Sequence, residues 1–123
     1  MQIALDGPSG AGKTAVGKRV ADRYSIGFLE SGKLYRGLAW SKLNGKDIEN
    51  LELELAPGRR NITRVVIEGT ELTEEELNSE EVGEKASIIA KKAKVRNIVT
   101  KAIRSYAAKK DLVIEGRDIG TIV

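Results

Sequence analysis

The chain has 123 residues, which is enough for one domain with a modest core and small for an enzyme that handles nucleotides. It contains no cysteine and no histidine, so disulfides, thiolate chemistry, histidine bases and histidine-bound metals are excluded. Chemistry must therefore rest on lysine, arginine, carboxylates, hydroxyls and the backbone. That set of groups suits phosphoryl transfer, which depends mostly on positioning and on charge stabilisation.

The net charge of +3 is mild, and the charged residues are unevenly distributed. Glutamates crowd residues 71–84, whereas lysine and arginine are frequent over 85–110. We interpret this pattern as solvated helix faces, and we do not expect nucleic-acid binding because aromatic residues are too few to stack bases. No apolar stretch approaches the ~20 residues of a membrane span, and the first residues leave no room for a signal peptide. We expect a cytoplasmic protein that does not contact a membrane.

The first predicted element is a buried strand over residues 1–5, which are mostly apolar. Residues 7–14 follow it and match the phosphate-binding pattern G-x-x-x-x-G-K-[ST] at every position. The glycines let backbone N–H groups surround an anion, the lysine reaches the outer phosphates, and the threonine hydroxyl can ligate Mg²⁺. A helix then runs to a stop at Gly27, with apolar residues at helical spacing from Val16 to Tyr24. The predicted phosphate-binding residues are Gly7, Pro8, Ser9, Gly10, Ala11, Gly12, Lys13 and Thr14.

The middle of the chain predicts several short elements. Residues 28–29 indicate a very short strand, and a helix follows over about 33–44. Asp47 is placed to cap a further short helix through Leu55. Residues 62–68 alternate between apolar and polar side chains, which predicts a strand in a small antiparallel sheet outside the main one.

The last third predicts two helices and a strand. Ser79, followed by two glutamates, is typical of a helix N-terminus, and a second helix begins near Lys94. Residues 112–114 then form a short apolar strand. The resulting order of strand, helix, strand, helices and strand predicts a parallel α/β core with right-handed crossovers.

Three further clusters distinguish between classes of phosphate chemistry. They are residues 30–36 (ESGKLYR), Ala86-Ser87 with Arg96 nine residues later, and residues 113–121 (VIEGRDIGT). Together with the loop, and in the same chain order, they resemble the bacterial cytidylate (CMP) kinase family over the whole chain. The resemblance implies an α/β fold with a P-loop NTPase-type parallel sheet, flanking helices and a small inserted α/β segment that binds substrate.

The resemblance also implies a division of the chain and a set of site residues. Residues 1–40 and 94–123 would form the P-loop core, and 41–93 the segment that binds the monophosphate nucleotide. ATP with Mg²⁺ would be the phosphate donor, and CMP or dCMP the acceptor. The implied metal residues are Thr14 and Glu115, and the implied catalytic residues are Lys13 and Arg117. The implied acceptor-binding residues are Ser31, Arg36, Ser87, Arg96, Arg117 and Asp118.

The side chains at these positions suit such roles chemically. Arginine offers a planar fork for a phosphate dianion or a pyrimidine carbonyl. The resemblance implies that Ser31 and Arg36 meet the monophosphate nucleotide, that its cytosine is read by Ser87 and Arg96, and that its phosphate and ribose are held by Arg117 and Asp118. A serine hydroxyl can hydrogen-bond a base edge, and an aspartate can accept from an amino or sugar hydroxyl group.

Some positions depart from the family pattern or stay open. Glu30 replaces the usual aspartate, and Lys33 stands where a small residue is common, which weakens the preference for CMP over UMP. Tyr35 lies on an apolar helix face, and we interpret it as a packing residue. Asp6 beside the loop could assist Mg²⁺ or fix the turn, and the sequence does not decide between them.

The family continues beyond the apolar residues 121–123 with a mobile arginine-bearing lid, two more core strands and an adenine-contacting loop. We expect a core that is incomplete at its C-terminus, and little or no kinase turnover from these 123 residues, because closing lids exclude water and supply transition-state charge. In the family's strand order, residues 3–5 would form an uncovered edge of the sheet. We therefore also expect self-association through that edge.

Two other interpretations stay open, namely a non-catalytic nucleotide-binding module and another small-molecule P-loop kinase. A P-loop switch GTPase is disfavoured because the guanine-reading N-K-x-D motif and a D-x-x-G-Q segment are missing. The preference among CMP, dCMP and UMP is not determined by the sequence.

Overall fold

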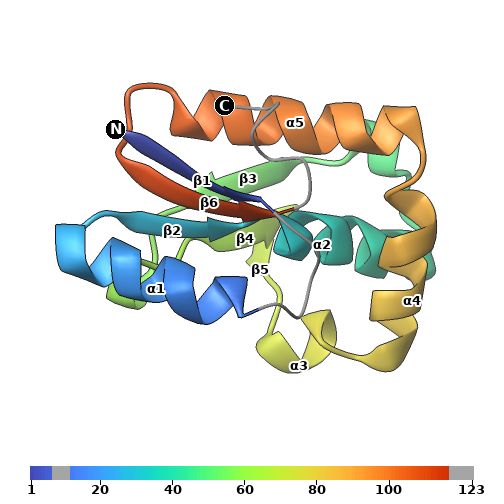
Figure 1. The fold of residues 1–123 in the computed structure, drawn as a ribbon. Helices are drawn as coiled ribbons and strands as arrows, with labels where there is room; N and C mark the ends of the chain where they lie inside the picture. Colours follow the sequence, from blue (N-terminus) through green and yellow to red (C-terminus); the bar gives the residue numbers. More distant parts are fainter. Residues whose placement is uncertain (7–11, 117–123) are drawn as a thin grey trace.

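Three parallel strands form the main sheet of the structure, a computed structural model that describes residues 1–6 and 12–116. Strand β6 (Leu112–Gly116) lies in the centre, between β1 (Gln2–Asp6) and β2 (Gly27–Glu30) (Figure 1). All five residues of β6 are buried, as expected for a strand that has neighbours at both edges and helices on both faces. The predicted parallel α/β core is therefore confirmed. Residues 3–5 lie in an edge strand, as expected.

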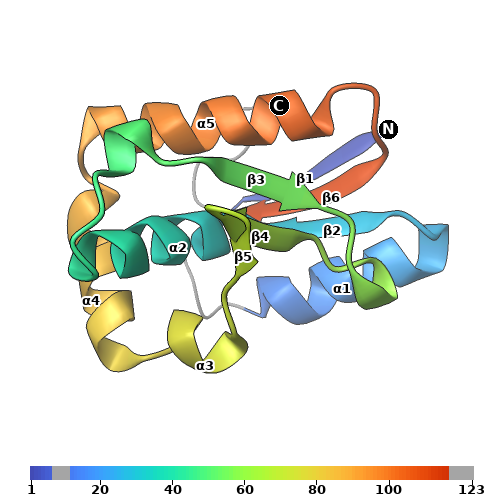
Figure 2. The same cartoon turned by 180° about the vertical axis from the view of Figure 1, so that it is seen from behind.

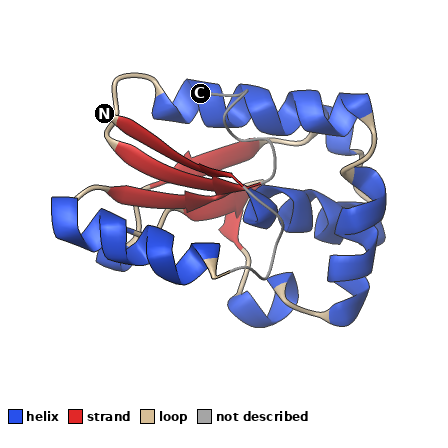
Figure 3. Cartoon of the chain, viewed as in Figure 1, coloured by secondary structure: helices blue, strands red, loops and turns tan. Residues whose placement is uncertain are grey.

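Helices cover both faces of this sheet (Figures 1 and 3). Phe28 and Val113 pack on one face with α1, whereas Leu29 and Ile114 join a larger core on the other. This alternation follows because successive side chains of a strand point to opposite faces. Among the described residues, no helix is both long and apolar enough to cross a membrane. The helices that cover the sheet are α1 (Lys13–Tyr24) on the first face, and α2 (Ser31–Leu43) and α5 (Ala93–Ala107) on the second.

A second, antiparallel sheet lies behind the first in Figure 1 and in front of it in Figure 2. Its strands are β3 (Leu53–Ala56), β4 (Arg64–Ile67) and β5 (Thr70–Glu71), in that order. The antiparallel strand predicted over 62–68 is thus confirmed. Val65 and Ile67 of β4 are buried in the same core as Leu29 and Ile114, so one apolar cluster joins the two sheets.

The helix predicted over residues 47–55 is wrong. Asp47 does cap a helix, because its carboxylate accepts from the Glu49 N–H, but that helix is a 3₁₀ turn of Ile48–Asn50. Leu53 and Leu55 then alternate with glutamates and pack against the core from β3. Apolar residues at every second position lie on one face of a strand and can all be buried there. In a helix the same residues would be spread around the helix and could not share one buried face. A second 3₁₀ turn, Arg59–Asn61, connects β3 to β4.

Two shorter helices follow the second sheet, and one of them was not predicted. The unpredicted helix is α3 (Glu74–Leu77), where Thr73 and Glu76 form a capping box. The other is α4 (Glu80–Ile89), and the Ser79 side chain accepts from the Val82 N–H as the predicted cap.

The end of the first helix also differs from its prediction. Helix α1 ends at Tyr24, before Gly27, because Ser25 takes the left-handed conformation with φ 53° and closes the helix. Gly27 is instead the first residue of β2. A Cβ there would lie 2.7 Å from Cδ2 of Leu112, so the glycine allows β2 to approach β6 closely.

Candidate functional site

Two carboxylates lie side by side where the parallel strands end. Glu115 of β6 and Glu30 of β2 are paired in register. Each lies two residues beyond a side chain, Val113 or Phe28, that packs with α1, so both carboxylates project on the α1 face. In open parallel sheets this carboxyl edge is where ligands bind.

Helix α1 meets this edge at Thr14. The Thr14 hydroxyl Oγ1 donates to Glu115 Oε2 at 3.3 Å, although 101 residues separate the two. Glu115 is only 8% exposed. Hydroxyl and carboxylate oxygens suit Mg²⁺, which commonly binds one or two such side chains and keeps several waters. The structure therefore brings together the two residues predicted for Mg²⁺, and their binding of the ion stays a prediction.

The N-terminus of α1 is suited to an anion. Gly12, at the N-cap, has φ 77°, which favours glycine. No described side chain caps this end, and the first turn has no acidic residue. Backbone N–H groups and the helix dipole therefore favour negative charge here. Lys13 is the first residue of the helix.

Several predicted site residues lie outside the described part of the chain, so their roles stay predictions. They are Gly7, Pro8, Ser9, Gly10, Ala11, Arg117 and Asp118.

The start of α2 presents the predicted acceptor residues Ser31 and Arg36. Ser31 is buried as the first residue of the helix. Arg36 Nη2 lies 3.6 Å from Glu30 Oε2, and a Cβ on Gly32 would lie 3.0 Å from Arg36 Nη1. Arg36 Nε is buried and has no hydrogen-bond partner among the described residues. A guanidinium with a buried, unsatisfied N–H is suited to bind an added anion.

Tyr35 connects α2 with Arg96 of α5. It is half-buried and packs against the larger core, as predicted. Burial raises the pKa of the Tyr35 phenol above its ordinary value of 10.0, and the nearby charge of Arg96 partly opposes the rise. Helices α2 and α5 pack against each other, so Arg96 lies on a helix next to the one that carries Arg36.

Ser87 lies on the exposed side of α4, and its hydroxyl donates to the Gly83 carbonyl at 3.2 Å. This bond, made four residues back, is common for serine within a helix. Helix α4 packs against α2, the helix that carries Ser31 and Arg36. The roles of Ser87 and Arg96 in reading a base stay predictions.

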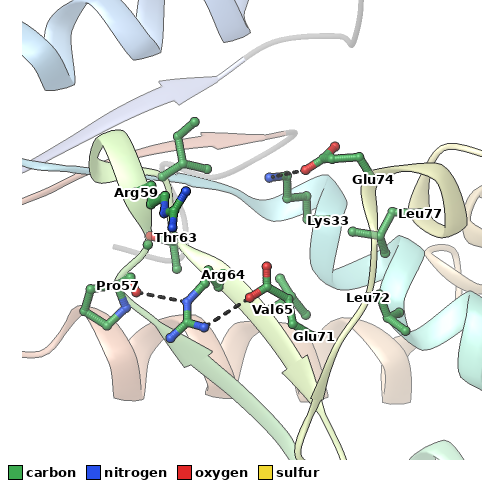
Figure 4. A pocket seen from close by; sticks show the side chains of 12 residues that line it. Lys33, Pro57, Arg59, Thr63, Arg64, Val65, Glu71, Leu72, Glu74 and Leu77 are labelled. Atoms are coloured by element: carbon green, nitrogen blue, oxygen red, sulfur yellow. Dashed lines mark hydrogen bonds and ion pairs between the residues drawn. The ribbon is translucent and has the colours of Figure 1, made fainter.

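A pocket of about 640 Å³ lies beside Lys33 of α2 and was not predicted (Figure 4). It is bordered by Lys33, by the turn between β3 and β4, and by α3. Lys33 Nζ lies 3.3 Å from Glu74 Oε1 on its wall, and Arg64 donates to the Pro57 carbonyl and to Glu71 Oε1, both at 3.1 Å. The sequence signalled this place only through the departure of Lys33 from the family pattern.

The comparisons with known proteins agree on one family. The family model described as cytidylate kinase matches residues 3–123. The chain belongs to the cytidylate kinase family. It is 40% identical to a cytidylate kinase of Alkaliphilus oremlandii over 100% of this chain and 59% of that protein. It is 38% identical to a cytidylate kinase of Aquifex aeolicus over 98% of this chain and 57% of that protein. It is 39% identical to one of Thermosipho melanesiensis over 99% of this chain and 58% of that protein.

This membership agrees with the resemblance found in the motifs and with the observed sheet. The chain spans somewhat less than three fifths of the length of these cytidylate kinase relatives.

Proposed function

We propose that this chain carries the phosphate loop and the acceptor site of a cytidylate kinase. The reaction moves the γ-phosphoryl group of ATP to CMP or dCMP and gives ADP and CDP or dCDP. The observation that carries the proposal is the contact of Thr14 with Glu115 at the start of α1, in a chain of this family. It supports a Mg²⁺ and phosphate site at the carboxyl edge of the sheet.

In this proposal the loop 7–14 holds the donor phosphates with its N–H groups and Lys13. Thr14 and Glu115 would hold Mg²⁺, which neutralises charge on the phosphates when it is bound. The acceptor would be bound on α2, α4 and α5. Its residues would be Ser31, Arg36, Ser87 and Arg96, together with Arg117 and Asp118.

The chemical step needs positioning and charge, which these residue types supply. A phosphate oxygen of CMP attacks the γ-phosphorus in line and forms the new P–O bond. The bond from that phosphorus to the bridging oxygen breaks, and ADP leaves with the bonding electron pair. Lys13 and Arg117 would stabilise the charge that spreads over the transferred group, with no covalent enzyme intermediate.

Calorimetry together with an ADP-release assay tests the proposal. We expect the 123-residue chain to bind both Mg·ATP and CMP, and to bind AMP much more weakly than CMP. We expect little turnover from these 123 residues. Binding of ATP without binding of CMP would overturn the proposal. Turnover with an acceptor other than a pyrimidine monophosphate would favour another small-molecule kinase.

A non-catalytic nucleotide-binding module is the second candidate, because a phosphate loop can bind a nucleotide without transferring its phosphoryl group. Product analysis separates the two candidates. A module binds CMP and Mg·ATP and forms no CDP even at high protein concentration, whereas a weak enzyme forms CDP in proportion to the protein added. A cytoplasmic location stays a prediction.

A further inference from the structure

Lys33 lies beside Arg36 on the same side of α2, one turn earlier. Residues three apart on a helix are surface neighbours. The Lys33 side chain is only 13% exposed, whereas that of its partner Glu74 is 72% exposed. The pair therefore consists of a lysine enclosed at the edge of the pocket and a carboxylate that reaches it from solvent (Figure 4).

Two cations of this helix, Lys33 and Arg36, act on the Glu74 carboxyl group. Its partial burial acts to raise the pKa of the carboxyl, but the Lys33 ammonium beside it, a hydrogen bond from Asn78 and the charge of Arg36 outweigh this and lower it. Arg36 also holds a buried Nε–H that has no partner among the described residues. The Glu74 carboxylate thus pairs with the ammonium, while the guanidinium pairs with Glu30 and keeps a donor that is unsatisfied among the described residues.

A phosphate group matches these groups better than the carboxylate does. It carries up to two negative charges and three acceptor oxygens, whereas Glu74 brings one charge and shares its Oε2 with Asn78. Release of Glu74 has a small free-energy cost for the carboxylate itself, because Glu74 is 72% exposed and is hydrated when it turns to solvent, while the phosphate takes its place beside the enclosed lysine. Glu74 also belongs to a four-residue helix, so its side chain can turn to solvent without moving the sheet.

We propose that Lys33 is a second ligand, beside Arg36, for the phosphate of the acceptor nucleotide, and that Glu74 occupies this place until the phosphate arrives. The inference rests on the proposed function, since it needs a monophosphate bound on α2. It assigns a binding role to a residue that departs from the family pattern.

Two variants with opposite expected effects test the inference by calorimetry with CMP. Lys33→Met removes the ammonium and retains the apolar part of the side chain. It should weaken the binding of CMP about tenfold, as expected for loss of one charge-assisted hydrogen bond. Glu74→Gln removes the competing charge and should tighten the binding of CMP about threefold. In the double variant with Lys33→Met, the change Glu74→Gln should no longer tighten the binding of CMP. Cytidine, which has no phosphate, should bind equally to all four proteins.

The chain offers a matched control in a second Lys–Glu pair, Lys94 with Glu49, whose Nζ and Oε1 atoms are also 3.3 Å apart. Lys94→Met and Glu49→Gln should leave CMP affinity unchanged. Weaker CMP binding by Glu74→Gln, or unchanged binding by Lys33→Met, would overturn the inference and leave the pair as a contact that holds α3 to α2. Because Glu74 is exposed, its variant tests the inference even if Lys33→Met does not fold.

The outcomes also separate this inference from the proposed function. Wild-type protein that binds no CMP overturns both. If the wild-type protein binds CMP but the variants do not change CMP affinity in the expected directions, only the role of Lys33 and Glu74 is overturned.

Discussion

Gly17 seats α1 on the sheet, and an alanine at this position tests that contact. A Cβ at residue 17 would lie 2.4 Å from Cε1 of Phe28 and 3.2 Å from Cδ1 of Leu5. Carbon atoms attract one another only beyond about 3.5 Å, so the first contact is too short by about 1.1 Å. Phe28 is 2% exposed and packs with Val113, so its ring has no free space to enter. The helix itself must therefore move by about an ångström.

We expect Gly17→Ala to lower the free energy of unfolding by about 1–2 kcal/mol. Overpacking of a core costs about 1–3 kcal/mol, and the higher helix propensity of alanine returns up to about 1 kcal/mol. Thr14 lies one turn earlier on the same helix, so a shift of α1 also moves its hydroxyl from Glu115. Displacements of this size can reduce function about a hundredfold. Urea denaturation measures the first effect, and calorimetry with Mg·ATP the second.

Gly83 of α4 provides the matched control, because a Cβ there would meet nothing within 4 Å. Gly83→Ala should raise the free energy of unfolding by about 0.5–1 kcal/mol and leave Mg·ATP affinity unchanged. A Gly17→Ala protein that matches wild type in both stability and Mg·ATP affinity would refute the close packing of α1 on β2.

Three other substitutions and one measurement on the unchanged chain test separate parts of the structure. Thr14→Val should weaken the binding of Mg·ATP at least about tenfold and that of metal-free ATP much less, since the hydroxyl is a predicted Mg²⁺ ligand. Equal losses of affinity for the two in calorimetry would contradict that role. Ser25→Gly should raise the free energy of unfolding in urea by about 1 kcal/mol, because Ser25 has φ 53°, and a loss of stability would count against this left-handed turn. Since burial raises the pKa of Tyr35, the unfolded chain ionises first above pH 10 and stability falls as pH rises. Tyr35→Phe should flatten this fall and remove one phenol with a raised pKa from the ultraviolet titration, and an unchanged titration would argue against its burial. Strand β1 pairs only with β6 among the described residues, so we expect concentration-dependent association in sedimentation, and a clean monomer at micromolar concentration would contradict it.

The elements that the sequence predicted well are those whose local pattern and buried face agree. Helix α5 shows this through apolar residues that recur at helical spacing, and strand β6 through a short, continuous apolar run that is fully buried. Residues 47–55 show the opposite case. A good cap at Asp47 favours a helix, while leucines at every second position over 51–55 favour a strand, and contact with the core decides for the strand.

Some contacts of the candidate site could likewise be predicted from the sequence, and others could not. Thr14 and Glu115 could be paired from sequence because a phosphate loop and the end of a neighbouring parallel strand meet by topology. The contact of Lys33 with Glu74 could not, since it needs the second sheet to fold back and a four-residue helix to end beside α2. No local sequence pattern predicts such a contact. The only sign of it in the sequence is the unusual lysine in the motif.

Helix α2 links the acceptor residues to the second sheet. Gly37, next to Arg36 in the helix, admits the side chain of Ile67, to which a Cβ at residue 37 would lie only 2.9 Å away. Val65 and Ile67 are buried in the same cluster as Leu38. Exposure of three such side chains costs about 5–9 kcal/mol, as much as the whole stability of many domains. A rigid withdrawal of this sheet from α2 on nucleotide binding is therefore disfavoured. The smaller movement, in which an exposed carboxylate such as that of Glu74 leaves a cation on α2, needs no loss of core.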